Sequence, residues 1–512
     1  MLLLNVILGI ATASPVSVYP IFDPTLVQLD YGAFQGVQDQ SSRSFLNIPF
    51  AAAPLGKLRF APPQPPVTVN GTQDATKFGN GCIQNIRSGF LNGTGLTPSE
   101  DCLNLNVFVP KRAKRYSKLP VVVFIHGGGF DSGYSASAYY DGRNIIGNVA
   151  DDVILVTFNY RVGVFGFLAS NELASKGYLN AGLLDQVAVF KWVRKYIAKF
   201  GGDPTKVTAF GQSAGAISIG VHLTAQQGSN TLFDRAVLHS GGVPLIAMLP
   251  SQQQPTFNKI AAGVNCSNST IGVIECLQNV DASVLYQTVS PLRIQFNPVI
   301  DFTYVNAQPI SNLLAGKFQK IPLMVNNVAD EGTWFTAPVV TNPAIIVPFE
   351  KQLLPFLNDQ EFSQLQSLYP PASYNVAFQA AGDVFGDVGF QMPGFFTAEA
   401  YNAAGLTAIK SEFKHIPVKA SDNLKALGVY HGSDLGFTWN YMAVLDSSEL
   451  EFSKLIAQRW INFAKGIAVD SNCQNGTRVN LALNGSTVVP DIERVEKAKF
   501  WKAVIKRVFQ IQ

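Results

Sequence analysis

Long apolar runs without polar alternation predict the buried strands of a sheet. The segments Leu119–Ile125 (LPVVVFI) and 153–158 are rich in β-branched residues, which is typical of strands covered on both faces. Residues 183–200 instead carry apolar positions at helical spacing and end at a Gly-Gly-Asp-Pro turn. Strands that alternate with helices predict an α/β fold with a doubly wound sheet. Further strands are expected at 25–35, 37–45, 103–110, 236–238, 323–325 and 428–430, and covering helices at 452–468 and 495–509.

A glycine-flanked serine lies where one strand is predicted to meet a helix. The extended run 207–210 leads into GQSAG at 211–215, with Ser213 at its centre, and a helix-like apolar segment follows. On such a sharp turn the flanking glycines leave room that side chains would fill, and the serine hydroxyl projects at a helix N-terminus. A G-x-S-x-G match is expected by chance in roughly one such chain in four. The motif therefore needs support from the rest of the sequence.

A run of glycines gives that support. HGGG at 126–129 directly follows a predicted buried strand, and its chance occurrence is expected in well under about one chain in a hundred. Successive glycines let backbone N–H groups turn toward a substrate oxygen, because no Cβ stands in the way. Two such donors, with the N–H of the residue after the serine, can hold an oxyanion. The two motifs together indicate a serine nucleophile.

Composition favours a large hydrophobic core and excludes several classes of protein. Hydrophobic residues make up 47% and charged residues 14% of the 512 positions, which argues against disorder. The net charge is +3 and the basic residues are scattered, so no nucleic-acid partner is indicated. No Cys-x-x-Cys or Cys/His spacing predicts a metal site. We therefore expect neither a metal nor another cofactor.

The amino terminus indicates secretion. Residues 1–14 (MLLLNVILGIATAS) combine an apolar core with an Ala-Thr-Ala cleavage pattern and are predicted to form a signal peptide. The apolar run is too short to span a bilayer, and no stable membrane anchor is expected. A secreted, extracellular protein would also explain the N-glycosylation sequons, which begin at Asn70, Asn92, Asn265, Asn268, Asn475 and Asn484.

The five cysteines agree with an oxidising compartment. Cys82 and Cys102 bracket one loop, and Cys266 and Cys276 bracket another. Two local disulfides are expected from this spacing, and Cys473 is left single.

Several segments, in one order, resemble the type-B carboxylesterase/lipase family, the α/β-hydrolases that include cholinesterases and large fungal lipases. The resemblance covers the chain from about Phe45 onward and implies an α/β-hydrolase fold, with a large, mostly parallel central sheet flanked by helices and a single domain at 15–512. The segments that carry it are FLNIPFAAAPLGKLRFAPP, SEDCLNLNVF, HGGGF, NYRVGVFGFL, GLLDQVAVFKWV, FGGDPTKVTAFGQSAGA, ADEGTWF and VYHGSDLGF.

The histidine of the expected catalytic triad must follow the serine and the acid in the chain. His222 and His239 lie too close to Ser213 and are interpreted as scaffold residues, and His415 precedes a strand-like Ile-Pro-Val. His431 follows a short apolar run in a loop. By the resemblance, His431 is the catalytic histidine.

The acid is one of two neighbours, Asp330 and Glu331, since adjacent side chains point in different directions. The family carries glutamate before the glycine, which implies Glu331; Asp387 and Asp434 are more distant alternatives. Glu331 would orient His431, and His431 would take the proton of Ser213 and return one to the leaving alcohol. The implied reaction is ester hydrolysis through an acyl-enzyme.

By the same resemblance, the N–H groups of Gly128, Gly129 and Ala214 supply the oxyanion hole. Gln212 is a departure, because many members carry glutamate there; the triad itself stays intact. Two ion pairs, Arg59 with Glu100 and Arg161 with Asp185, are expected to be structural.

The loop 82–102 corresponds to the family's lid region, and Ile83, Ile86 and Phe90 would share the face of a small amphipathic flap. Its shortness favours an esterase over an interfacial lipase or sterol esterase acting on long-chain esters.

A non-catalytic binding protein is the remaining class, but no triad residue is missing. The partner is a small-molecule or lipid ester, and a homodimer is neither indicated nor excluded. Phe130, Trp334, Phe335, Phe395 and Phe396 either line an apolar pocket or belong to the core.

Overall fold

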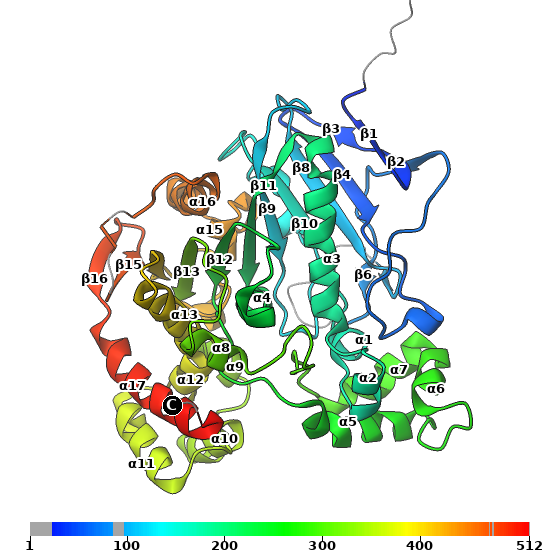
Figure 1. Ribbon diagram of the computed structural model, residues 1–512. Coiled ribbons are helices and arrows are strands. Elements are labelled where there is room, and N and C mark those ends of the chain that lie inside the picture. The colour runs from blue at the N-terminus through cyan, green and yellow to red at the C-terminus, as the bar shows by residue number, and fades with distance from the viewer. Residues whose placement is uncertain (1–22, 85–96, 471, 474–475, 511–512) are drawn as a thin grey trace, which may run out of the picture.

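A large mixed sheet forms the centre of the protein (Figure 1). The computed structural model describes residues 23–84, 97–470, 472–473 and 476–510. Within them the sheet has eleven strands. In spatial order these are β16 (Thr487–Pro490), β15 (Thr477–Leu481), β14 (Ala408–Phe413), β13 (Leu323–Val328), β12 (Arg235–His239), β11 (Gly202–Gln212), β9 (Leu119–Ile125), β10 (Ile154–Phe158), β8 (Asn104–Pro110), β4 (Ser42–Pro49) and β3 (Val37–Gln38).

The central strands of this sheet run parallel; in spatial order they are β15, β14, β13, β12, β11, β9 and β10. The strand pairs outside them, at both edges of the sheet, are antiparallel. The mostly parallel α/β sheet expected from the apolar runs is thus confirmed. The carboxyl ends of parallel strands lie at one edge of a sheet, where ligands bind in such folds. That edge carries the candidate site described below.

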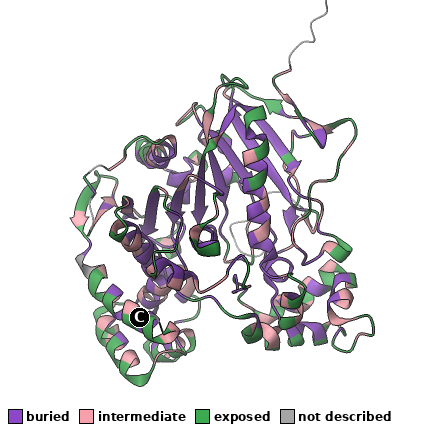
Figure 2. Cartoon of the chain, in the orientation of Figure 1, coloured by how far each residue is buried: buried purple, intermediate pink, exposed green. Residues whose placement is uncertain are grey.

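The central strands are buried on both faces, which explains their unbroken apolar pattern (Figure 2). In β9, Val121 and Val123 belong to the core that packs under α3 (Ala181–Tyr196) and α4 (Ala214–Thr224). Their neighbours Val122 and Phe124 point to the opposite face, where they join the core of Trp460 and α16 (Leu450–Lys465). Alternate residues of one strand therefore serve two separate cores.

The strand expected at 428–430 is absent, and this prediction is wrong. Tyr430 makes only an isolated bridge to Asp330, and Gly428 has a positive φ of 72°. The strand that follows β13 in the sheet is β14, which was not predicted. Its sequence, AIKSEF, alternates apolar and charged residues, because Lys410 and Glu412 are held in buried ion pairs.

Smaller differences concern element ends. The segment expected at 25–35 is a hairpin of β1 (Leu26–Leu29) and β2 (Gly32–Gln35), and the one at 37–45 is divided between β3 and β4. The covering helices are α16 and α17 (Ile492–Phe509). Residues 1–14 and most of the proposed flap, 85–96, lie outside the described residues. Among those described, no helix is both long and apolar enough to cross a membrane.

The expected covalent and ionic links are present. Both disulfides form, Cys82–Cys102 and Cys266–Cys276, and Cys473 is a buried free thiol. The two scaffold ion pairs form as well: Arg59 Nε lies 2.6 Å from Glu100 Oε1, and Arg161 Nη2 lies 2.7 Å from Asp185 Oδ1.

Candidate active site

A sharp turn connects β11 to α4 and is made by Ser213 alone. The serine has φ 57° and ψ −124°, a region that side-chain-bearing residues rarely occupy. A Cβ added to Gly211 would lie 2.4 Å from the Gly215 carbonyl carbon, and one on Gly215 would lie 2.0 Å from Ile125 O. Both glycines are thus required by backbone contacts, as the sequence pattern indicated. The strained turn holds Ser213 at the carboxyl edge of the sheet.

The triple-glycine loop packs directly against this turn. A Cβ on Gly127 would lie 2.9 Å from the Cβ of Ser213, and Gly128 and Gly129 have φ of 110° and 62°. A Cβ on Gly128 would lie 2.1 Å from Ser132 O, so glycine is required there too. Ala214 is the first residue of α4, where backbone N–H groups have no carbonyl partner within the helix. These N–H groups belong to two segments that meet at the serine.

His126 holds the loop from beneath. Its buried ring stacks on Tyr160 at 4.3 Å, and Nδ1 lies 2.8 Å from Gly127 O. Burial lowers the pKa of His126 to about 4, so the ring is neutral at neutral pH and donates one hydrogen bond to that carbonyl. The histidine of HGGG is therefore a support of the loop.

A buried carboxylate and an imidazole lie beside the turn. Glu331 follows β13 and precedes α9 (Thr333–Thr336), and its Oε2 lies 2.6 Å from His431 Nδ1. Its other oxygen, Oε1, accepts hydrogen bonds from Asn327 Nδ2 at 3.1 Å and Val328 N at 3.0 Å. The carboxylate is 2% exposed and cannot rotate freely, because both of its oxygens have partners.

The partners of His431 indicate its tautomer. An ionised Glu331 can only accept, so Nδ1 carries the proton. On the other side of the ring, Nε2 lies 3.3 Å from Nε2 of Gln212, an amide that can only donate from that atom. A lone pair at Nε2 is therefore aimed at the residue next to Ser213, which is the state that a general base requires.

Gln212→Glu should reduce activity mainly at acidic pH. A carboxylate in place of this amide would stabilise the protonated imidazole of His431, and a protonated ring cannot accept the serine proton. We expect kcat/KM to fall roughly tenfold at pH 5 and by less than about threefold at pH 8. A pH–rate profile of the variant beside the parent protein measures this, and a uniform loss at all pH values would contradict it.

The alternative acids are engaged elsewhere. Asp330 Oδ2 accepts the N–H of Val429 at 2.7 Å and so fastens the segment that leads to His431. Asp387 accepts the hydroxyl of Tyr369 at 2.7 Å, and Asp434 pairs with His239 at 2.5 Å. Of the four carboxyl groups considered, Glu331 is the one that the structure brings to His431.

The other histidines also have fixed partners. His222 is buried, with Nε2 2.8 Å from Gln186 Oε1, and His415 Nε2 lies 2.6 Å from Glu449. Sequence reasoning took His239 as a scaffold residue but missed its pairing with Asp434. Three histidine–carboxylate pairs therefore occur in the described chain, and His431–Glu331 is the pair whose imidazole lies against the side-chain amide of Gln212, the residue before Ser213.

Aromatic rings surround His431 on one side. Phe390 stacks on the imidazole at 4.2 Å and Phe335 lies at 5.2 Å. Of the five aromatics considered from the sequence, Phe130 and Phe396 are each 1% exposed and belong to the core. Trp334 stacks on Tyr430 at 5.5 Å, and Phe395 lines a cavity behind β13. Phe390 was missed, since only the fold brings residues 386–391 to the histidine.

Known proteins are similar to the chain along most of its length. A model of the carboxylesterase family matches residues 23–476. Fumonisin B1 esterase of Sphingopyxis macrogoltabida is 37% identical over 400 residues, which cover 74% of this chain and 69% of that protein. Carboxylesterase 5A of Mus musculus is 32% identical over 451 residues, 82% of this chain and 77% of that one. The solved structure of Aspergillus niger EstA has a TM-score of 0.84 and 30% identity, and the match covers 95% of this chain and 99% of that one. With the family model spanning most of its length and esterases aligned along it, the chain belongs to the carboxylesterase family and is a carboxylic ester hydrolase.

Proposed function

We propose that this protein hydrolyses esters through an acyl-enzyme, with Ser213 as nucleophile, His431 as general base and acid, and Glu331 as the group that orients the histidine. The observation that carries the proposal is the position of His431, which donates from Nδ1 to Glu331 while its Nε2 lies beside Gln212, next to the serine. A base that a carboxylate orients, beside a serine held on a strained turn, is the arrangement that activates a hydroxyl.

The reaction then proceeds in two half-reactions. Ser213 Oγ bonds to the ester carbonyl carbon while its proton passes to His431 Nε2, and the alcohol leaves with that proton. Water attacks the acyl-enzyme, His431 takes one proton from it, and the carboxylic acid leaves as Ser213 regains its proton. In both halves the negative charge on the former carbonyl oxygen would be held by the N–H groups of Gly128, Gly129 and Ala214. Each of these donors is worth roughly 3–4 kcal/mol of transition-state stabilisation.

We also propose soluble esters with polar groups as substrates, in preference to lipid droplets. The support is a cavity of about 40 Å³ beside the glycine loop, lined by apolar side chains but also by Asp131 and Arg293. Burial raises the pKa of Asp131. An apolar acyl chain that entered this cavity would leave Asp131 and Arg293 without hydrogen bonds, at a cost in affinity.

A series of nitrophenyl esters from acetyl to palmitoyl tests the proposal, assayed below and above the solubility limit of each ester. We expect a preference for short or medium chains and no jump in rate at the emulsion boundary. Long-chain preference with such a jump would make the protein an interfacial lipase. Absence of hydrolysis across the series, with activity no higher than that of a Ser213→Ala variant, would contradict the catalytic proposal as a whole.

We propose further that residues 1–14 are removed on secretion and that 15–512 form one glycosylated domain. The support is the pair of disulfides and the exposure of the sequon asparagines that the structure describes, Asn70, Asn265, Asn268 and Asn484. The amino-terminal sequence of the protein recovered from the medium tests this.

A further inference from the structure

Five ionised side chains gather at one edge of the sheet, behind the strand that leads to Glu331. We call them the C-terminal ion cluster, because three of its members follow residue 476, where the match to the family model ends. Glu412 contacts Arg494 and lies 3.2 Å from Arg478, and Asp491 contacts Arg478 and lies 2.7 Å from Lys410 Nζ. These side chains are only 2–15% exposed. The cluster consists of Lys410, Glu412, Arg478, Asp491 and Arg494.

The cluster carries more positive than negative charge. It has three cations against two carboxylates, and Lys414, 2.5 Å from Glu412, adds a fourth cation at its border. Water and salt screen buried charges less than exposed charges, so a buried charge acts on other charges over a longer distance. An unbalanced positive charge at this place therefore acts on any carboxylate nearby.

Glu331 is such a carboxylate. Burial on its own would lower the pKa of Arg494, but the carboxylates of Glu412, Asp387, Asp491 and Glu331 raise it above its ordinary value. The attraction between the Arg494 guanidinium and each of these carboxylates is a coulombic interaction, which is stronger where the groups are shielded from water.

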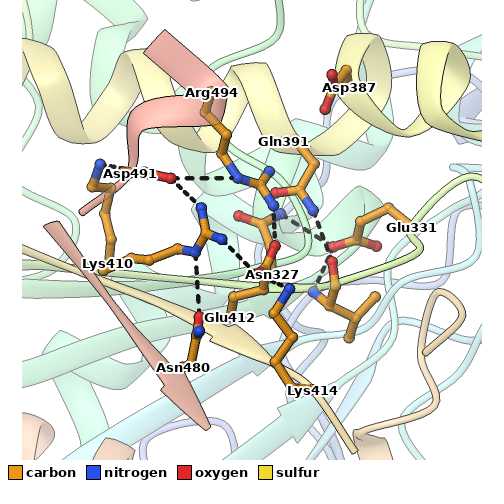
Figure 3. Close-up of polar contacts among 12 residues, drawn as sticks. Asn327, Glu331, Asp387, Gln391, Lys410, Glu412, Lys414, Asn480, Asp491 and Arg494 are labelled. Atoms are coloured by element: carbon orange, nitrogen blue, oxygen red, sulfur yellow. Dashed lines mark hydrogen bonds and ion pairs between the residues drawn. The ribbon is translucent and has the colours of Figure 1, made fainter. Parts of the chain in front are cut away.

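The physical link is a layer of two amides (Figure 3). Asn327 Nδ2 donates to Glu331 Oε1, and Gln391 Nε2 donates at 2.7 Å to the carbonyl of Val328, whose own N–H donates to the same carboxylate oxygen. Asn327 and Gln391 line a cavity of about 20 Å³ whose remaining wall includes Arg494 and Glu412. The two amides and a space of about the size of a water molecule thus lie between the cluster and the triad acid.

We propose that Arg494 is a positioning residue of the catalytic triad, which from the start of α17 keeps Glu331 ionised across the Asn327 layer and thereby sets the acidic limit of activity. The inference rests on the proposed function, since it assumes that Glu331 and His431 act together. It assigns the last helix of the chain an electrostatic part in catalysis, in addition to covering the edge of the sheet.

Other charged groups near Glu331 and His431 also affect the protonation of this pair. Asp330 precedes Glu331 in the chain and Asp434 follows His431, and the charges of Lys414 and Glu412 also act on Asp330. From the neighbouring elements, the groups are Asp383 on α12 (Ala377–Gly386), Asp387 with its partner Lys497, and His239, which pairs with Asp434.

Arg494→Gln tests the proposal through the pH dependence of kcat/KM. The active form holds an ionised Glu331 and an unprotonated His431, so loss of a nearby positive charge favours the inactive, protonated form. We expect the acid limb to move up by roughly 0.5–1 pH unit, which is a three- to tenfold loss at acidic pH with little change on the plateau. The fold should survive, because Glu412 keeps Lys414 and Arg478.

Two further variants separate this effect from others. Arg494→Lys keeps the charge and should keep the acid limb in place. Arg507→Gln removes an equal charge from the exposed end of the same helix, where Arg507 pairs with Glu361, and should leave the limb unchanged. If the acid limb of kcat/KM stayed in place in Arg494→Gln and only the melting temperature fell, the cluster would have a purely structural role. If Arg507→Gln moved the acid limb by the same amount, the effect would come from the overall charge of the protein. Either result would overturn the proposal.

A readout without substrate keeps the inference distinct from the proposed function. The chain has five histidines, so histidine-labelled protein gives few ring signals, and the one lost in a His431→Asn variant belongs to His431. Arg494→Gln should move the titration midpoint of that signal to higher pH. An unchanged midpoint would contradict the inference even in an active enzyme, whereas absence of serine-dependent hydrolysis with a shifted midpoint would contradict only the proposed function.

Discussion

Replacing Ser213 with alanine is expected to reduce kcat/KM for a simple ester by roughly 10⁴- to 10⁶-fold. No other hydroxyl in the described chain lies on the turn that meets the glycine loop, so no neighbour can replace the lost nucleophile. The rate that remains would come from binding and from the oxyanion donors. The free energy of unfolding should change little, because alanine takes the same positive φ at this position and keeps the Cβ atom of the serine. Steady-state kinetics and urea unfolding of the two proteins measure both expectations.

Ser240→Ala is the matched control. Ser240 is also buried, also has a positive φ of 56°, and also follows a central strand, and its hydroxyl has no hydrogen-bond partner among the described residues. It lies close to the turn, since a Cβ on Gly241 would be 3.2 Å from Ser213 O. We expect the variant to keep activity within a few-fold. A loss comparable to that of Ser213→Ala would mean that the region, and not the hydroxyl of Ser213, controls the rate.

The sequence predicted those parts of the fold whose cause is local. The run Leu119–Ile125 is apolar because it is buried on both faces, and two glycines flank Ser213 because backbone atoms occupy the space of their side chains. Such causes leave a direct mark in the residues, so the sheet, the turn and the glycine loop could all be anticipated.

Strand β14 could not be predicted in the same way. Lys410 and Glu412 give it the appearance of an exposed segment, yet their ion-pair partners Asp491 and Arg494 lie about 80 residues further on, at separations of 81 and 82. Charged residues are buried only when paired, and the pairing exists only in the folded chain. The strand wrongly expected at 428–430 shows the converse, since its short apolar run lies in the loop that carries His431.

The sequence alone also could not select the catalytic acid. Adjacent residues point in different directions, so the sequence could say that only one of Asp330 and Glu331 reaches the histidine, and only a family resemblance selected between them. In the structure, Asp330 turns to the backbone of Val429, and Glu331 turns to His431. Both side chains therefore help to position the imidazole of His431. Asp330 holds the segment that leads to His431, and Glu331 binds the imidazole ring itself.

Glu331→Gln should reduce kcat by roughly 10³- to 10⁴-fold and leave KM nearly unchanged. The oxygen that accepts from Asn327 and Val328 faces two donors, so the glutamine oxygen is expected to keep that place and its NH₂ group to face His431. A donor at this position forces Nδ1 to become an acceptor and moves the ring proton to Nε2. The histidine then has no lone pair at Nε2 with which to accept the proton of Ser213, although its geometry is preserved.

Asp330→Asn separates this tautomer effect from a general loss of charge beside the triad. Burial raises the pKa of Asp330, so a neutral amide there removes less charge than at an exposed position, and the asparagine oxygen can still accept from Val429. We expect kcat to fall less than about tenfold, with the loss appearing as a lower melting temperature rather than a lower rate. If instead Asp330→Asn abolished activity and Glu331→Gln retained it, the acid would be Asp330, and His431 would have to turn its ring away from the partner that it has here.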